Sequence, residues 1–148
     1  MVDDVQAIKN IVLSYVELLD LGDLDGLAAV FDRATVRVPG LEQELRGAQE
    51  FRDFIARSVQ FHDGIPSTKH VVSNLIVEVD DDRRSATARS YYTALQARPE
   101  LPLQPILAGR FHDRLARDHE SWHIVQRVIH VDLIGDVRFH VTGLEEIN

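Results

Sequence analysis

The order in which two periodicities appear along the chain constrains its fold most. Up to residue 59, apolar residues recur at the spacing of amphipathic helices, and from residue 70 onward long β-branched runs replace that spacing. Helices are predicted over 5–20, 24–31 and 48–59, with a short strand at 35–38. Helices followed by long strands are typical of an α+β fold, in which the helices gather on one face of a mostly antiparallel sheet.

Helix-end signals support the first boundaries. Asp3 is a predicted N-cap, with Gln6 three residues later as its reciprocal partner. Gly22 stands where the first helix should end, and Asp23 can cap the second helix. We therefore expect only a short turn between the first two helices.

Four long strands are predicted in the second half of the chain, over 70–79, 87–97, 106–116 and 122–133. Between the second and third of them lie Pro99, Pro102 and Pro105. Because proline cannot donate a ladder hydrogen bond, this stretch is not expected to pair regularly in a sheet.

The chain beyond Gly135 carries a weaker signal. The spacing of Val137, Phe139 and Val141 hints at one further short strand. No repeat, low-complexity segment or internal boundary is visible, and 148 residues suit one core. We therefore expect a single domain spanning residues 1–148.

Composition narrows the classes of partner. The chain has 16 basic and 24 acidic residues, a net charge of −8, which argues against a nucleic-acid partner and against docking on an anionic membrane. It has no cysteine, which excludes disulfides and thiolate chemistry. The N-terminus lacks the layout of a signal peptide, and no apolar run approaches the roughly 20 residues of a membrane span. The expected location is the cytoplasm.

Metal and cofactor signals are weak. His119 and His123 have a spacing that a helix would turn into a metal pair, but here it crosses a turn and a strand start. His62, His112 and His140 have no near partner in the sequence. No phosphate loop, nucleophile elbow or dinucleotide fingerprint is visible. We therefore expect neither a metal nor a cofactor.

Asp20 and His70 are the best candidates for catalytic residues. Asp20 stands where the first helix should end, and His70 opens the first long strand. A carboxylate beside an imidazole makes an acid–base pair that works near neutral pH. Each residue also has a plain structural interpretation. The helical wheel, at about 100° per residue, favours a solvated Asp20, and His70 could instead bond a backbone carbonyl at the mouth of its strand.

Strand alternation places a possible pocket face around His70. The face shared with His70 would carry Val72, Asn74 and Ile76. Such a mixture of apolar and polar side chains suits the lining of a small-molecule pocket. The opposite face would carry Val71, Ser73, Leu75 and Val77. Its apolar members predict a surface through which a homodimer could pack.

Aromatic and polar residues elsewhere are further candidates for binding a ligand. Tyr15 and Tyr92 could hydrogen-bond a ligand, or they could simply fill the core. Phe31 and Phe111 are candidates for core or for apolar lining. His130 could serve the pocket or a dimer surface. Arg127 is expected to be structural, pairing with an acidic residue across the sheet.

Several motifs together resemble a known family. They are Asp20-Leu21-Gly22-Asp23 with Leu27, Val30-Phe31, Thr68 with His70 and Asn74, Gly109-Arg110-Phe111 with Asp113, and Trp122 with Ile124 and Arg127. In this order they resemble the SnoaL-like branch of the nuclear transport factor 2-like (NTF2-like) superfamily, over about residues 5–134. The resemblance implies a cone-shaped α+β barrel, with N-terminal helices on a curved sheet that encloses a cavity, and often a homodimer.

Within that superfamily, the chain is most similar in its candidate catalytic residues to scytalone dehydratase. This resemblance implies that Asp20 points into the cavity and that Asp20 and His70 are catalytic. The dehydratase uses a second histidine on the next strand, but residues 91–96 of this chain contain none. Tyr91, Tyr92 or Gln96 could supply the missing polar contact.

Two functions remain open from the sequence. The first is a cofactor-independent acid–base enzyme, of dehydratase, isomerase or cyclase type, acting on a small apolar oxygenated molecule. The alternative is a non-catalytic module of the same fold that binds a hydrophobic ligand or assembles subunits, because one fold hosts many functions.

Overall fold

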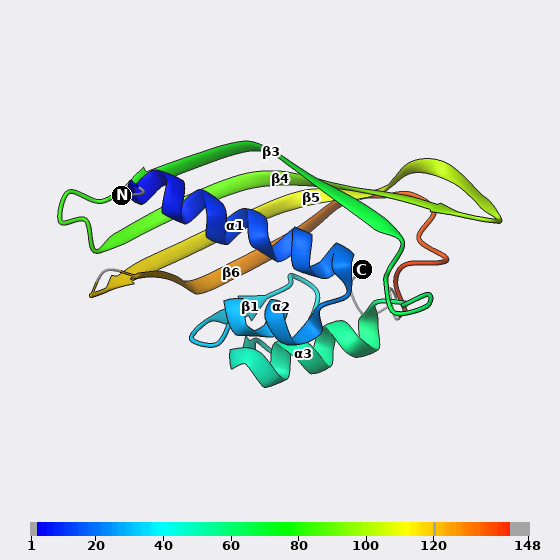
Figure 1. Ribbon diagram of the computed structural model, residues 1–148, viewed down its shortest axis with the longest axis horizontal. Helices are drawn as coiled ribbons and strands as arrows, with labels where there is room; N and C mark the ends of the chain where they lie inside the picture. The colour runs from blue at the N-terminus through cyan, green and yellow to red at the C-terminus, as the bar shows by residue number, and fades with distance from the viewer. Residues whose placement is uncertain (1–2, 120, 143–148) are drawn as a thin grey trace.

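A computed structural model describes residues 3–119 and 121–142 (Figure 1). The helices are α1 Asp4–Leu21, α2 Leu24–Val30 and α3 Gly47–Ser58. The strands are β1 Thr35–Arg37, β2 Leu45–Arg46, β3 Thr68–Val79, β4 Ser85–Arg98, β5 Leu101–Asp118 and β6 Ser121–Ile134. The strands form one open sheet in the order β2-β1-β6-β5-β4-β3. β1 runs parallel to β6, and every other neighbouring pair is antiparallel. The predicted α+β architecture is confirmed.

The end of α1 is held by the signals that the sequence carries. The Asp3 carboxylate accepts a hydrogen bond of 2.7 Å from the Gln6 amide, but the Gln6 side chain bonds Asn10 instead of completing a reciprocal cap. Gly22 adopts a left-handed conformation with φ 74°, and its amide closes the helix on Leu18 and Leu19. Asp23 then caps α2. This turn sets the position of the last residues of α1 beside the start of β3.

The proline-rich stretch pairs with β4, but irregularly, as the prolines predict. β5 begins at Leu101 and runs through Pro102 and Pro105, with Pro105 opposite Leu95 of β4. Two register shifts interrupt this part of the ladder. Pairing of β5 with β6 begins only at Leu107, so the prolines lie where β5 has a strand neighbour on one side alone. A missing N–H is tolerated at such an edge.

A bulge in β3 changes which side chains point inward. The register with β4 shifts between Ser73 and Ile76, and Asn74 has a φ of 54°. The predicted alternation is therefore wrong beyond Val72, because an extra residue reverses the two faces. Leu75 and Val77 pack against the core, whereas Asn74 and Ile76 are exposed.

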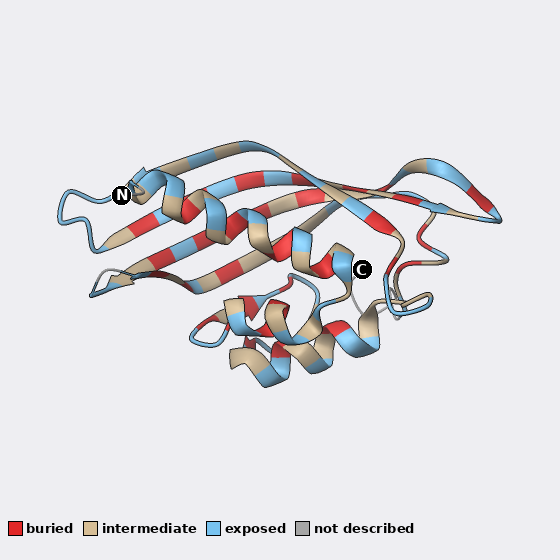
Figure 2. Cartoon of the chain, in the orientation of Figure 1, coloured by how far each residue is buried: buried red, intermediate tan, exposed pale blue. Residues whose placement is uncertain are grey.

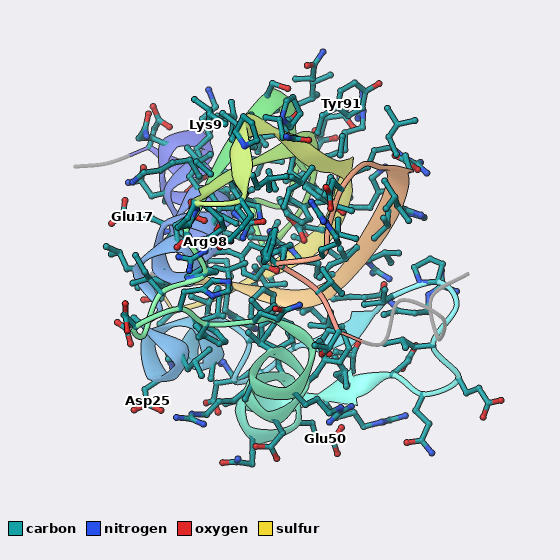
Figure 3. All side chains as sticks on the ribbon, turned by 90° about the vertical axis from the view of Figure 1, so that its right-hand side faces the viewer. Lys9, Glu17, Asp25, Glu50, Tyr91 and Arg98 are labelled. Atoms are coloured by element: carbon teal, nitrogen blue, oxygen red, sulfur yellow. The ribbon has the colours of Figure 1, made fainter. Side chains whose placement is uncertain are left out.

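The core lies between α1 and the inner face of the sheet. Buried positions alternate with more exposed ones along β4 and β5, as expected of strands with one face on a core (Figure 2). Charged side chains such as Glu17, Asp25 and Glu50 project outward from the helices (Figure 3). No helix in the described ranges is both long and apolar enough to cross a membrane.

A buried ion pair lies at the centre of this core. Arg127 Nε and Asp113 Oδ1 are 2.6 Å apart, and Arg127 Nη2 and Asp113 Oδ2 are 2.9 Å apart, with both side chains fully buried. The prediction that Arg127 pairs with an acidic residue across the sheet is confirmed. The guanidinium lies 4.6 Å from the ring centre of Tyr15 and 4.3 Å from that of Phe111, so it makes cation–π contacts with both rings.

The segment after β6 folds back towards α3 rather than adding a strand. Residues 137–140 form a turn, and Val141 makes an isolated bridge to Val59. The suggested extra strand is therefore wrong. The amides of His140 and Val141 bond the Val137 carbonyl, which closes the turn at 3.0 and 3.1 Å.

Candidate active site

Asp20 and His70 meet at the junction of α1 and β3. Asp20 Oδ1 lies 2.7 Å from His70 Nδ1 and accepts a second hydrogen bond of 2.8 Å from the Thr68 hydroxyl. Asp20 Oδ2 accepts a hydrogen bond of 2.8 Å from the His70 amide. The side chains are 10% and 5% exposed. The solvated position favoured by the helical wheel is wrong, because the start of β3 covers that margin of the helix.

The surroundings of Asp20 keep its carboxylate charged. Burial acts to raise the pKa of Asp20, but the hydrogen bonds from His70 and Thr68 and the charge of His70 outweigh it. The pKa of Asp20 therefore lies below its ordinary value. An ionised carboxylate at Nδ1 holds the imidazole proton on that nitrogen, which leaves the Nε2 lone pair available. Among the described residues, His70 Nε2 has no hydrogen-bond partner.

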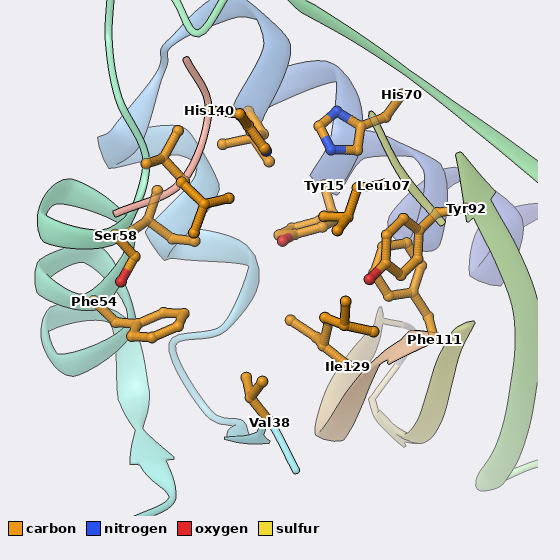
Figure 4. Close-up of a pocket in the computed structure, with 15 residues that line it drawn as sticks. Tyr15, Val38, Phe54, Ser58, His70, Tyr92, Leu107, Phe111, Ile129 and His140 are labelled. Carbon is orange, nitrogen blue, oxygen red and sulfur yellow. The ribbon is translucent and has the colours of Figure 1, made fainter. Parts of the chain in front are cut away.

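His70 forms part of the wall of an apolar cavity of about 100 Å³ (Figure 4). Its walls come from α1, α3, the inner face of the sheet and the segment after β6. The side chains that bring polar atoms to this wall are Tyr15, Ser58, His70, Tyr92 and His140. A few polar groups on a mostly apolar surface are the usual composition of a small-molecule site.

The two tyrosines differ in what their hydroxyls can offer a ligand. Within the described ranges, the Tyr15 hydroxyl has no hydrogen-bond partner, and burial raises the pKa of Tyr15 to about 12. Tyr15 is therefore a neutral donor facing the cavity. The Tyr92 hydroxyl donates to the His130 carbonyl at 2.9 Å. Gly109 leaves room for that bond, since a Cβ there would lie 2.6 Å from the hydroxyl oxygen.

Phe111 lines the cavity together with Tyr15 and Tyr92, but four other predicted ligand-binding residues do not. Phe31 is fully buried in the core, with its ring centre 5.5 Å from that of Tyr15. Val72 faces inward, but it lines a groove between α1 and β3 rather than the cavity.

Asn74 and His130 also lie away from the cavity. Asn74 is exposed at the β3 bulge, which turns it off the predicted face. His130 lies on the outer face of the sheet, with its ring centre 5.1 Å from that of His112. Its position follows from strand alternation, because the inner face of β6 at this point carries Ile129 and Val131.

His140 and Ser58 are polar residues of the cavity that sequence reasoning missed, and His140 is the titratable one. It is 3% exposed, and its ring centre lies 6.1 Å from that of His70. Burial, followed by the charge of His70, lowers the pKa of His140 to about 4, so this imidazole is neutral near pH 7. The only local signal was a histidine between two apolar residues, Phe139 and Val141, in a segment without clear periodicity.

Within residues 3–119 and 121–142, no group of three or more histidine, aspartate or glutamate side chains is placed to hold a metal ion. His119 is exposed at the end of the β5–β6 hairpin, where the chain turns before His123. Close ring-to-ring approaches of histidines in the described part of the chain are those of His70 with His140 and of His112 with His130.

Solved structures with the same architecture come from Novosphingobium aromaticivorans, among other sources. An NTF2-like protein with a cystatin-like fold has a TM-score of 0.73 at 19% identity, over 86% of this chain and 81% of that one. A protein provisionally described as a scytalone dehydratase has a TM-score of 0.69 at 20% identity, over 90% and 87%. The β subunit of a provisionally assigned aromatic-ring-hydroxylating dioxygenase has a TM-score of 0.66 at 16% identity, over 86% and 88%.

These likenesses establish the fold, which is NTF2-like. No curated protein sequence matched the chain. The family described as the SnoaL-like domain matches residues 1–128, which is most of the chain. The protein therefore belongs to the SnoaL-like domain family.

Proposed function

We propose that the protein is a cofactor-independent acid–base enzyme, of dehydratase, isomerase or cyclase type, acting on a small, largely apolar, oxygenated molecule. The observation that carries the proposal is the 2.7 Å contact between Asp20 and His70 at the wall of an apolar cavity. A buried carboxylate that orients an imidazole, whose other nitrogen is unoccupied, is the arrangement of a general base.

In the proposed reaction, His70 Nε2 takes a proton from a carbon next to the substrate carbonyl. The C–H electron pair moves into the carbonyl group, and negative charge develops on its oxygen. Tyr15 donates a hydrogen bond to that oxygen. The imidazolium formed at His70 is stabilised by Asp20, and it returns the proton either to another carbon or to a departing hydroxyl, which leaves as water.

The apolar wall of the cavity strengthens these interactions. Electrostatic stabilisation is worth more in an apolar, water-excluding site than in water, and a positioned acid–base group gives about 10²–10⁴-fold in rate. The volume of about 100 Å³ also limits the substrate. A cavity of roughly 150 Å³ accommodates benzene, so we propose a compound no larger than a single ring.

The test is turnover of a panel of single-ring ketones and β-hydroxy ketones. We expect wild type to convert at least one member, and His70→Ala to be slower by about 10²–10⁴-fold. His112→Gln is the matched control, because His112 is an exposed histidine on the opposite face of the sheet. Equal rates for wild type and His70→Ala would end the catalytic assignment.

The second candidate is a binding or assembly module of the same fold. It is favoured by the structural likeness to a dioxygenase β subunit and by exposed apolar side chains on the outer sheet face. Tyr91 projects outward there (Figure 3). Tyr91 is 53% exposed, and Leu133 in the same shallow depression is 70% exposed. We propose that this face forms a homodimer. Ligand binding without turnover would favour the module over the enzyme.

A further inference from the structure

His140 is the second imidazole at the cavity, and backbone hydrogen bonds fix its position. Its backbone carbonyl accepts a hydrogen bond of 2.8 Å from the Gln60 amide. The preceding carbonyl, of Phe139, accepts hydrogen bonds from His62 Nε2 at 2.8 Å and from Gln96 Nε2 at 3.1 Å. The segment after β6 is therefore clamped to the connection between α3 and β3 and to the inner face of β4.

The ring of His140 is unlike that of His70, because no carboxylate bonds it. Its Nδ1 is enclosed and has no hydrogen-bond partner. A buried N–H without an acceptor is rarer in proteins than an unpaired acceptor, so the proton belongs on Nε2. Nε2 is then the ring nitrogen that remains available to a molecule in the cavity.

The charges around His140 keep it neutral during the proposed reaction. The titratable groups that act on it are His70 from β3, Asp20 from α1 and His62 from the loop before β3. Burial and the charge of His70 both disfavour a second imidazolium. When His70 takes up a proton, His140 therefore does not compete for it. A neutral imidazole can polarise a carbonyl by donating a hydrogen bond.

We propose that His140 binds the oxygen of a single-ring carbonyl compound through its Nε2–H, while His70 faces the neighbouring carbon. The 6.1 Å between the two ring centres lets one such molecule contact both imidazoles. This inference rests on the proposed function for its choice of carbonyl substrates. Together with Tyr15, it assigns two neutral donors to the substrate oxygen.

The test compares two probes of nearly the same shape, cyclohexanone and methylenecyclohexane, of which only the first has an oxygen acceptor. Binding is measured by NMR titration, without any turnover. We expect wild type to bind the ketone more tightly and His140→Phe to reduce this preference about fivefold, the value of one net hydrogen bond. His112→Phe, which removes an exposed histidine, is the matched control and should keep the preference.

A second measurement on the wild-type protein avoids any dependence on folding of the variant. The ¹⁵N signals of the His140 ring should report a proton on Nε2, and the Nε2 signal should move on addition of cyclohexanone. Three results would each overturn the proposal. They are an unchanged preference for the ketone in His140→Phe, an Nε2 signal that does not move, and no binding of cyclohexanone at the highest concentration reached.

The outcomes separate this inference from the proposed function. His70→Ala should lose turnover but keep the preference for the ketone, because the oxygen contact lies at His140. A ketone preference that depends on His140, without turnover of any ketone in the panel, would leave His140 as a binding residue and remove the enzyme assignment. Turnover that depends on His70 but not on His140 would keep the enzyme assignment and remove the proposed role of His140.

Discussion

The two histidines of the cavity differ in their surroundings at the scale of single residues. Asp20 bonds the Nδ1 of His70, whereas the Nδ1 of His140 is enclosed without a partner. The first environment orients its imidazole, and the second disfavours the charged form of the His140 ring. Two titratable groups with such opposed environments are suited to different parts of one reaction, one accepting the proton and the other remaining a neutral donor.

The buried state of His140 should be visible in the stability of the protein. Because the folded pKa of about 4 lies below the unfolded value of 6.5, the unfolded state binds more protons between these values. The free energy of unfolding should therefore fall as pH drops from 6.5 to 4, and this histidine contributes about 3 kcal/mol to the decrease. His140→Phe should flatten the profile in urea titrations over this range. His112→Phe is the matched control, and identical profiles for wild type and His140→Phe would contradict the buried neutral imidazole.

Asp20 should affect stability in a lower pH range. Its folded pKa is lowered, so its contribution is present above the unfolded pKa of about 3.9 and is lost as pH falls through the lower folded value. Acid should therefore destabilise the protein in two steps, first through His140 in the segment after β6 and then through Asp20 at the junction of α1 and β3.

At the scale of elements, the turn after α1 decides where Asp20 lies. Gly22 ends the helix with a positive φ, and a Cβ there would collide with the carbonyl oxygen of Gly64. The close approach of these two backbones holds the end of α1 against the loop that leads to Thr68 and His70. The hydrogen bonds between Asp20 and the start of β3 depend on that contact.

Gly22→Ala and Gly64→Ala make a matched pair for testing this contact. Both positions have positive φ, so both variants bear a backbone cost of roughly 1–2 kcal/mol. Only Gly22→Ala adds a steric clash, because a Cβ at Gly64 meets nothing within 4 Å. We expect Gly22→Ala to lose about 1–3 kcal/mol more unfolding free energy in urea titrations. Equal losses would show that the close approach of Gly22 to Gly64 does not contribute to the stability of the protein.

At the scale of the whole molecule, the two faces of the sheet have separate roles. The inner face holds the core and the cavity, whereas the outer face carries exposed apolar residues beside the ion pair of Arg110 with Asp132. Strand alternation assigned Leu75 and Val77 to the outer face. They do not add to its exposed apolar surface, because the β3 bulge turns them into the core. Val71 remains outside and is 50% exposed.

The proposed homodimer gives a prediction at this scale. Leu133→Asp should shift the protein towards the monomer, because it places a charge in the apolar depression that Leu133 shares with Tyr91. Leu13→Asp on α1 is the control, since Leu13 is 40% exposed on the helical side of the molecule. Light scattering at several concentrations measures the effect. A strict monomer in wild type would refute the dimer.

The sequence by itself determined the type and order of most elements, because each depends on local information. Helical spacing, the Asp3 cap, the Gly22 turn and the β-branched runs are all readable within one element. Family resemblance also indicated Asp20 and His70 as partners and implied the NTF2-like fold. The early start of β5 at Leu101 and the β3 bulge escaped prediction, because both depend on which strand lies alongside.

Only the tertiary structure decided which side chains share the cavity. His140 reaches His70 because the segment after β6 is clamped across Gln60 and Gln96, which are contacts between residues far apart in the chain. The β3 bulge turns Asn74 away from the cavity, and His130 lies on the side of β6 that faces outward. Hydrophobic periodicity encodes neither feature. Local patterns report which side of its own element a residue occupies, and packing decides what lies opposite that side.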